Sequence, residues 1–168
     1  ITELKKNERV KELLLAINQE SNKTDDINEL APKIQHELSK LFDAENFYIV
    51  AYNENIDEYD FLYYKDKLNK KVDFIEHSHK LKESIIDYVR VSKETLLINK
   101  ETEKVLIEKG VISKYRDYSS VGCAAPLINS KGKSYGVIVV QNYNNMDAYS
   151  EDDVVFLDYV AKNLSKIF

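Results

Sequence analysis

The only cysteine of the chain, Cys123, lies in a run of small and apolar residues from Val121 to Ala125. A thiol becomes a reactive thiolate where positive charge lies nearby, and no basic residue stands close to Cys123 in the sequence. A single cysteine also excludes an internal disulfide bond and a metal site built from two cysteines. We therefore expect Cys123 to be a small buried side chain without a chemical role of its own.

Two histidines, His77 and His79, are two residues apart, with Asp73 and Glu76 close to them. On a β-strand the two imidazoles would share a face and could hold a metal ion. In a polar loop they would be solvated, and the spacings common in zinc sites are missing. The loop interpretation is favoured, so the sequence predicts no metal.

Catalytic patterns give no positive signal. Ser119 and Ser120 lack the glycines of a nucleophile elbow, and no nucleophile is accompanied by a base and an orienting group. The chain has 4 glycines, and none of them stand at the Gly-x-Gly spacing of a phosphate-binding loop. We therefore expect that this chain is not an enzyme.

The composition places the chain among soluble single domains. It has 168 residues, 43 % of them hydrophobic and 32 % charged, which is enough to bury one core. A net charge of −5 shows no basic excess, so we expect no nucleic-acid partner. No apolar run approaches the roughly 20 residues that span a bilayer, so this segment is not expected to insert into a membrane. The apolar helical pattern continues to Phe168, and we expect a piece of a longer protein.

Helical and strand patterns alternate along the chain. Apolar spacing predicts helices over residues 3–18, from Asp26 to about Phe42, over 80–91 and 101–109, and from Glu151 to the end. Aromatic and β-branched runs predict strands over 46–52, 60–64, 95–98, 120–128 and 134–143. Strands grouped in hairpins, with helices between them, favour an α+β domain with a mostly antiparallel sheet over a doubly wound parallel one.

Several short segments occur in an order that is more specific than any one of them. They are Asn46–Ile49 with Phe61–Tyr64, Leu81–Arg90 with Thr95–Ile98, and Ala125–Ile128 with Gly136–Gln141 and Tyr149–Asp153. This ordered set, from about residue 20 to the end, resembles a GAF domain. It is similar to the GAF domains of bacterial sensor histidine kinases and diguanylate cyclases.

The resemblance implies a six-stranded antiparallel sheet with helices on both faces, in a GAF-like sensory domain over residues 21–168. We expect residues 1–20 to form a signalling and dimerisation helix, and the last helix to continue into an output domain. The implied role is sensory or regulatory, in a cytoplasmic signal-transduction protein such as a two-component histidine kinase or a diguanylate cyclase. A rival interpretation is a structural dimerisation module that binds no ligand.

Three departures from the family argue against known activities of its members. Asn69-Lys70 is not followed by the Phe-x-x-x-Asp-Glu part of the cyclic-nucleotide signature. No Cys-His pair is present for a bilin chromophore, since Ala124 follows Cys123. The members that reduce methionine sulfoxide need more than one cysteine.

Analogy with the family places a pocket between one sheet face and the middle helices. Its implied walls are Phe61, Tyr63, Ile75, Leu81, Ile85, Ile98, Tyr118, Cys123 and Gln141, with Arg116 and Asp117 as polar contacts. The tyrosines near the first hairpin suit either a ligand cavity or an ordinary half-buried sheet. The sequence does not decide which alternate residues face inward, because a one-residue shift in register exchanges the two faces. We expect a neutral or singly charged small molecule as the ligand, and the sequence names no cofactor.

The last helix has apolar residues on two sides. One stripe follows the 3-4-3-4 spacing of a coiled-coil seam, in Val154, Leu157, Ala161, Leu164 and Phe168. A second stripe contains Phe156, Val160, Asn163 and Ile167, and the first helix has a similar run in Val10, Leu14 and Ile17. One stripe can cover the sheet while the other needs a partner, so we expect a homodimer through the terminal helices. The alternative is that both stripes pack within one chain.

Overall fold

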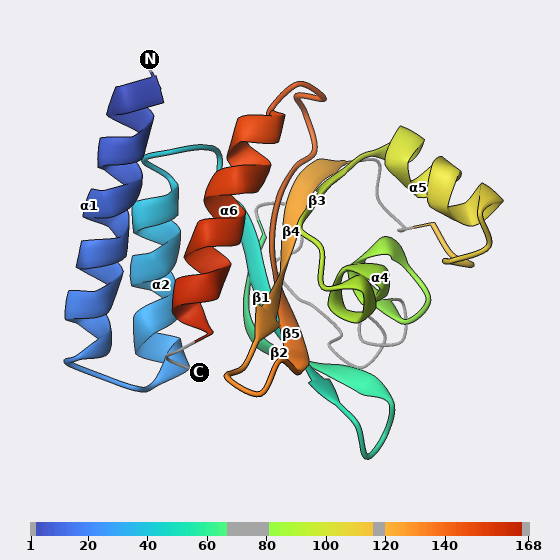
Figure 1. Ribbon diagram of the computed structural model, residues 1–168, viewed down its shortest axis with the longest axis horizontal. Helices are drawn as coiled ribbons and strands as arrows, with labels where there is room; N and C mark the ends of the chain where they lie inside the picture. The colour runs from blue at the N-terminus through green and yellow to red at the C-terminus, as the bar shows by residue number, and fades with distance from the viewer. Residues whose placement is uncertain (1–2, 67–80, 116–119, 166–168) are drawn as a thin grey trace.

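The computed structural model describes residues 3–66, 81–115 and 120–165 (Figure 1). The helices are α1 (Glu3–Ser21), α2 (Ile27–Leu38), α4 (Ile85–Ser92), α5 (Lys100–Glu108) and α6 (Glu151–Leu164). The strands are β1 (Asn46–Asn53), β2 (Glu58–Lys65), β3 (Leu96–Ile98), β4 (Val121–Ile128) and β5 (Ser134–Asn142). The expected α+β fold is confirmed, with most element ends within a few residues of those expected.

The strands form one antiparallel sheet in the order β2-β1-β5-β4-β3. The β4–β5 hairpin closes through a turn in which Gly132 has a φ of 79°, a conformation that glycine adopts without strain. A six-stranded sheet was expected, whereas the described residues form a five-stranded one.

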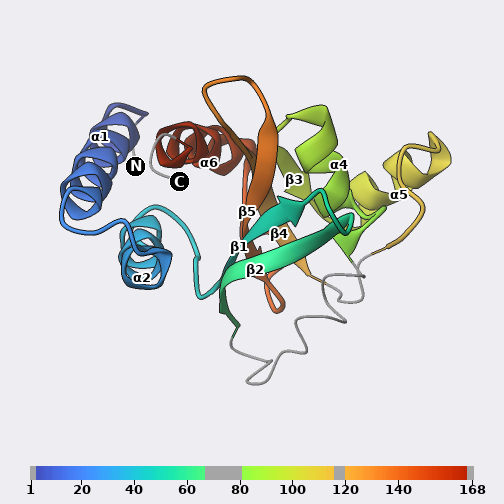
Figure 2. The ribbon, with the colours of Figure 1, turned by 90° about the horizontal axis from the view of Figure 1, so that it is seen from below.

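Helices cover both faces of this sheet. On one face lie α2 and α6, with α1 outside them, and on the other lie α4 and α5 (Figures 1 and 2). Neighbouring residues of a strand point to opposite faces, so β1 sends Phe47 and Ile49 into the core under α2 and α6. It sends Tyr48 and Val50 into the core under α4. We call these two sides the helical-layer face and the α4 face.

The two apolar stripes of α6 are both buried within one chain. Leu157, Val160 and Leu164 are fully buried, and Ala161 and Phe156 are nearly so. The corresponding residues of α1, Val10 and Ile17, are also buried, while Leu14 and Val154 are half-buried against the same core. The expectation that one stripe needs a partner chain is therefore wrong, because α1 and α2 join α6 in covering the sheet. Ile167 and Phe168 lie outside the described residues.

Replacing Leu157 by Ala should lower the free energy of unfolding by about 2–5 kcal/mol, because it leaves a cavity under α6. The matched control is Leu15→Ala on α1, where the side chain is 60 % exposed, and it should cost less than about 0.5 kcal/mol. Urea unfolding followed by circular dichroism measures both. Equal effects of the two substitutions would show that α6 is not packed as described.

Candidate functional site

The residues predicted to line a pocket do not all lie on one face of the sheet. Phe61, Leu81, Ile85 and Ile98 gather in the core on the α4 face. Gln141 lies on the same face, because it is two residues after Val139 in β5 and Val139 packs in that core. Four other predicted residues, Ile75, Arg116, Asp117 and Tyr118, lie outside the described residues, as do His77 and His79.

Tyr63 lies on the opposite face, and a β-bulge is the reason. Ile49 pairs with Tyr63 and Val50 pairs with Phe61, so Leu62 is an extra residue without a partner in β1. Phe61 and Tyr63 are two residues apart, but the bulge turns them to different faces. The Tyr63 hydroxyl donates to Oε1 of Gln35 in α2, at 3.1 Å. Its placement in the pocket is therefore wrong.

Cys123 also lies on the helical-layer face, fully buried. Its neighbour Ala124 faces α4 instead, so the predicted placement was off by one residue. Burial, together with the negative charges of Asp153 and Glu151, raises the pKa of the Cys123 thiol far above its usual range. The expectation of an unreactive buried thiol agrees with this environment.

Three aromatic rings from β1 and β2 pack together on the α4 face. The ring centroids of Tyr48 and Phe61 are 5.7 Å apart, and those of Phe61 and Tyr64 are 5.6 Å apart. Tyr48 and Tyr64 stack with an angle of 25° between their planes. We call Tyr48, Phe61 and Tyr64 the aromatic triad. Tyr48 is buried, whereas Phe61 and Tyr64 are half-buried.

The carboxylate of Asp66 lies beside the triad and accepts hydrogen bonds from two tyrosine hydroxyls, one of which belongs to the triad. Oδ2 of Asp66 accepts hydrogen bonds from the hydroxyls of Tyr64, at 3.0 Å, and Tyr143. Nε2 of Gln141 in turn donates to the Tyr143 hydroxyl, at 3.0 Å. Burial and the nearby Asp66 raise the pKa of Tyr143 well above its usual range, so this hydroxyl stays protonated. Sequence reasoning missed Asp66 and Tyr143, because both follow the ends of strands and carry no motif.

A second polar group is centred on Asp87, near the start of α4. Its Oδ1 accepts from the Tyr59 hydroxyl at 2.6 Å and from Nη2 of Arg90 at 3.1 Å. Its Oδ2 accepts from the backbone N–H of Glu83 at 3.0 Å. Burial alone would raise the pKa of Asp87, but these hydrogen bonds outweigh it and hold the pKa below its ordinary value.

The same group fastens α4 to the hairpin between β1 and β2. The Arg90 guanidinium lies over the ring of Tyr52, 3.6 Å from its centroid, and Nε donates to the Tyr59 hydroxyl at 2.8 Å. Lys82 lies 2.8 Å from Oδ1 of Asp57, in the hairpin turn. The group, which we call the α4 ion cluster, consists of Tyr52, Asp57, Tyr59, Lys82, Asp87 and Arg90.

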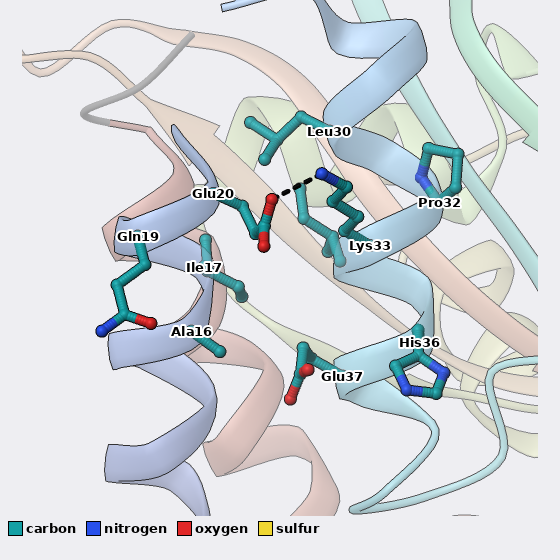
Figure 3. A pocket seen from close by; sticks show the side chains of 10 residues that line it. Ala16, Ile17, Gln19, Glu20, Leu30, Pro32, Lys33, His36 and Glu37 are labelled. Carbon is teal, nitrogen blue, oxygen red and sulfur yellow. Dashed lines mark hydrogen bonds and ion pairs between the residues drawn. The ribbon is translucent and has the colours of Figure 1, made fainter. Parts of the chain in front are cut away.

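Away from the α4 face, a hollow of about 310 Å³ lies between α1 and α2. Glu20 and Lys33 point toward each other across it and form an ion pair at 2.5 Å (Figure 3). The charged groups at this hollow are paired with each other, as are those of the α4 ion cluster. Within the described part of the chain, no group of His, Cys or acidic side chains is placed to hold a metal ion. No helix among those residues has the length and apolar character needed to cross a membrane.

The geometry agrees with the comparisons with known proteins. The GAF-domain family model matches residues 26–167. The chain therefore belongs to the GAF-domain family, and the resemblance drawn from the sequence is confirmed. No curated protein matches the sequence.

Solved structures of low sequence identity share the fold. The GAF domain of an Acinetobacter phosphoenolpyruvate-protein phosphotransferase is 18 % identical, with a TM-score of 0.66 over 99 % of this chain and 93 % of that one. A methyl-accepting chemotaxis protein is 13 % identical, with a TM-score of 0.59 over 89 % of this chain and 92 % of that one. A far-red-absorbing dark state with bound biliverdin IXa is 11 % identical, with a TM-score of 0.58 over 91 % and 95 %.

Replacing Asp87 by Asn should destabilise the domain by about 1–3 kcal/mol at neutral pH, because Arg90 loses its carboxylate. The folded-state pKa of Asp87 lies below the unfolded value of about 3.9. Its contribution to stability is therefore present above that value and is lost as the pH falls through the folded-state pKa. Asp87→Asn should remove this part of the acid dependence.

The matched control is Asp60→Asn, an exposed position on β2. Urea unfolding at several pH values between about 3 and 7 measures both variants. If Asp87→Asn and Asp60→Asn change the stability equally across that range, the α4 ion cluster does not fasten the helix as described.

Proposed function

We propose that this chain is the sensory domain of a signal-transduction protein and binds a small molecule on the α4 face of its sheet. The observation that supports this is the chemical contrast between the two faces. The helical-layer face is mostly aliphatic beneath three helices, although it also holds aromatic rings such as Phe47, Tyr63 and Phe156. The α4 face combines the aromatic triad with Asp66, Tyr143 and Gln141. Apolar walls with a few convergent polar groups are typical of ligand sites.

The proposed ligand is a neutral or singly charged molecule with an aromatic or apolar part and at least one hydrogen-bond donor. The triad supplies flat apolar contact, and the Asp66 carboxylate accepts hydrogen bonds but repels anions. A phosphate-bearing ligand is disfavoured for the same reason. The biliverdin-bound structure of the same fold supports a binding role for the domain, although this chain lacks a Cys-His pair.

The proposed output is a flanking domain of a cytoplasmic histidine kinase or diguanylate cyclase, reached through the terminal helices. The similar domain from a methyl-accepting chemotaxis protein supports a role in signalling. α4 is the element that a ligand on this face would displace, and the α4 ion cluster would transmit that displacement to the β1–β2 hairpin. We propose that the chain senses and regulates and that it performs no catalysis.

Mass spectrometry of the domain isolated under native conditions tests the ligand. We expect a small molecule that is neutral or singly charged to be released on denaturation. Recovery of a cyclic nucleotide would contradict this proposal. If nothing is released and none of a broad metabolite set raises the melting temperature, the domain is a structural module without a ligand.

Two neighbouring substitutions on β2 locate the site. Phe61→Ala should weaken binding of the recovered compound about tenfold or more, because it removes one ring of the triad. Leu62→Ala is the matched control, since Leu62 is also half-buried but packs on the helical-layer face. Isothermal titration measures both, and equal weakening by the two substitutions would move the site away from the α4 face.

A further inference from the structure

The short turn between α4 and β3 connects the two sides of the sheet. α4 ends at Ser92 on one side, whereas α6 lies on the other (Figure 2). In β3, Ile98 packs on the α4 face and Leu97 on the helical-layer face, and alternation places Thr95 on the side of Leu97. Oγ1 of Thr95 donates to Oδ1 of Asp158 in α6 at 2.7 Å. We call this hydrogen bond the edge link, because β3 stands at the end of the strand order.

The turn that carries Thr95 is held by hydrogen bonds of its own. Lys93 caps α4, and its backbone N–H donates to the Val89 carbonyl at 3.0 Å. The backbone N–H of Glu94 donates to Oγ of Ser92 at 3.3 Å. Because these bonds join the turn to the last turn of α4, a displacement of the helix end moves Thr95 with it instead of being absorbed between them.

Residues with left-handed backbone conformations stand at both ends of α4. Glu83, before the helix, has a φ of 65°, and Lys93, after it, has a φ of 62°. Asp57, in the β1–β2 turn that Lys82 contacts, is the third non-glycine residue with a positive φ in the described part of the chain. Strained residues of this kind gather at switch regions, where the surrounding structure holds them in place. They mark α4 as an element whose ends can change conformation.

We propose that the edge link is a regulatory connection, which passes a movement of α4 to α6 around the β3 edge of the sheet. This inference rests on the proposed function only in that a ligand on the α4 face is the natural cause of the movement. Thr95 acts through Asp158, so it is a positioning residue for α6. Oδ2 of Asp158 also lies 2.8 Å from Nζ of Lys162, so the link reaches the second half of α6.

Proton–nitrogen correlation NMR of the 168-residue chain tests the edge link without a ligand. Asp87→Asn disturbs α4 from its first turn, and it should shift the amide signals of α6 around Asp158. In a chain that also carries Thr95→Val, which removes the hydroxyl, these shifts should be lost. Thr95→Ser keeps the hydroxyl and should retain them. Asp60→Asn, at an exposed position of β2, is the control and should leave the α6 signals in place.

Asp158→Ala removes the acceptor instead of the donor, and it keeps the test open if Thr95→Val does not fold. In its background, too, Asp87→Asn should shift no α6 signals. Unmoved α6 signals in the Asp87→Asn chain would overturn the proposal, and so would shifts of equal size with and without the Thr95 hydroxyl. Failure of any ligand to bind would contradict the proposed function and leave these results unchanged.

Discussion

The central strands are buried on both sides, and this constraint shapes the rest of the domain. β1, β4 and β5 are buried along most of their length. Helices must therefore cover both faces of the sheet. Consecutive strand residues then enter two different cores, such as Cys123 on one side and Ala124 on the other. Each central strand therefore contributes side chains to both cores, and the two cores differ in composition.

Under the proposed function, the two cores divide stability from recognition. The helical-layer face joins α1, α2 and α6 to the sheet in the larger hydrophobic cluster. The α4 face is smaller and holds aromatic rings beside charged groups, with Asp87 hydrogen-bonded from three directions. In the proposed function, a ligand on this face would act on α4 and on the β1–β2 hairpin, while the other core keeps the sheet in place.

The sequence was sufficient to predict the fold, because the periodicities along most of the chain are clear and its segments occur in the family's order. The faces of the strands were less predictable. The bulge at Leu62 depends on how β1 pairs with β2, and no local signal marks it, so Phe61 lies on the α4 face while Tyr63 lies on the other. The burial of Leu157 and Leu164 was mistaken for an interface, because the packing of α1 and α2 beside α6 is a tertiary property. Asp66 and Tyr143 meet only in the folded chain, 77 positions apart.

A crystal structure of the domain isolated under native conditions tests most directly whether a ligand binds on the α4 face and not on the helical-layer face. The account predicts electron density for a small molecule in contact with the aromatic triad and within hydrogen-bonding distance of Asp66 or the Tyr143 hydroxyl. The helical-layer face should be filled by protein side chains alone. Density for a ligand against α1, α2 or α6, or an α4 face closed entirely by the protein's own side chains, would contradict it.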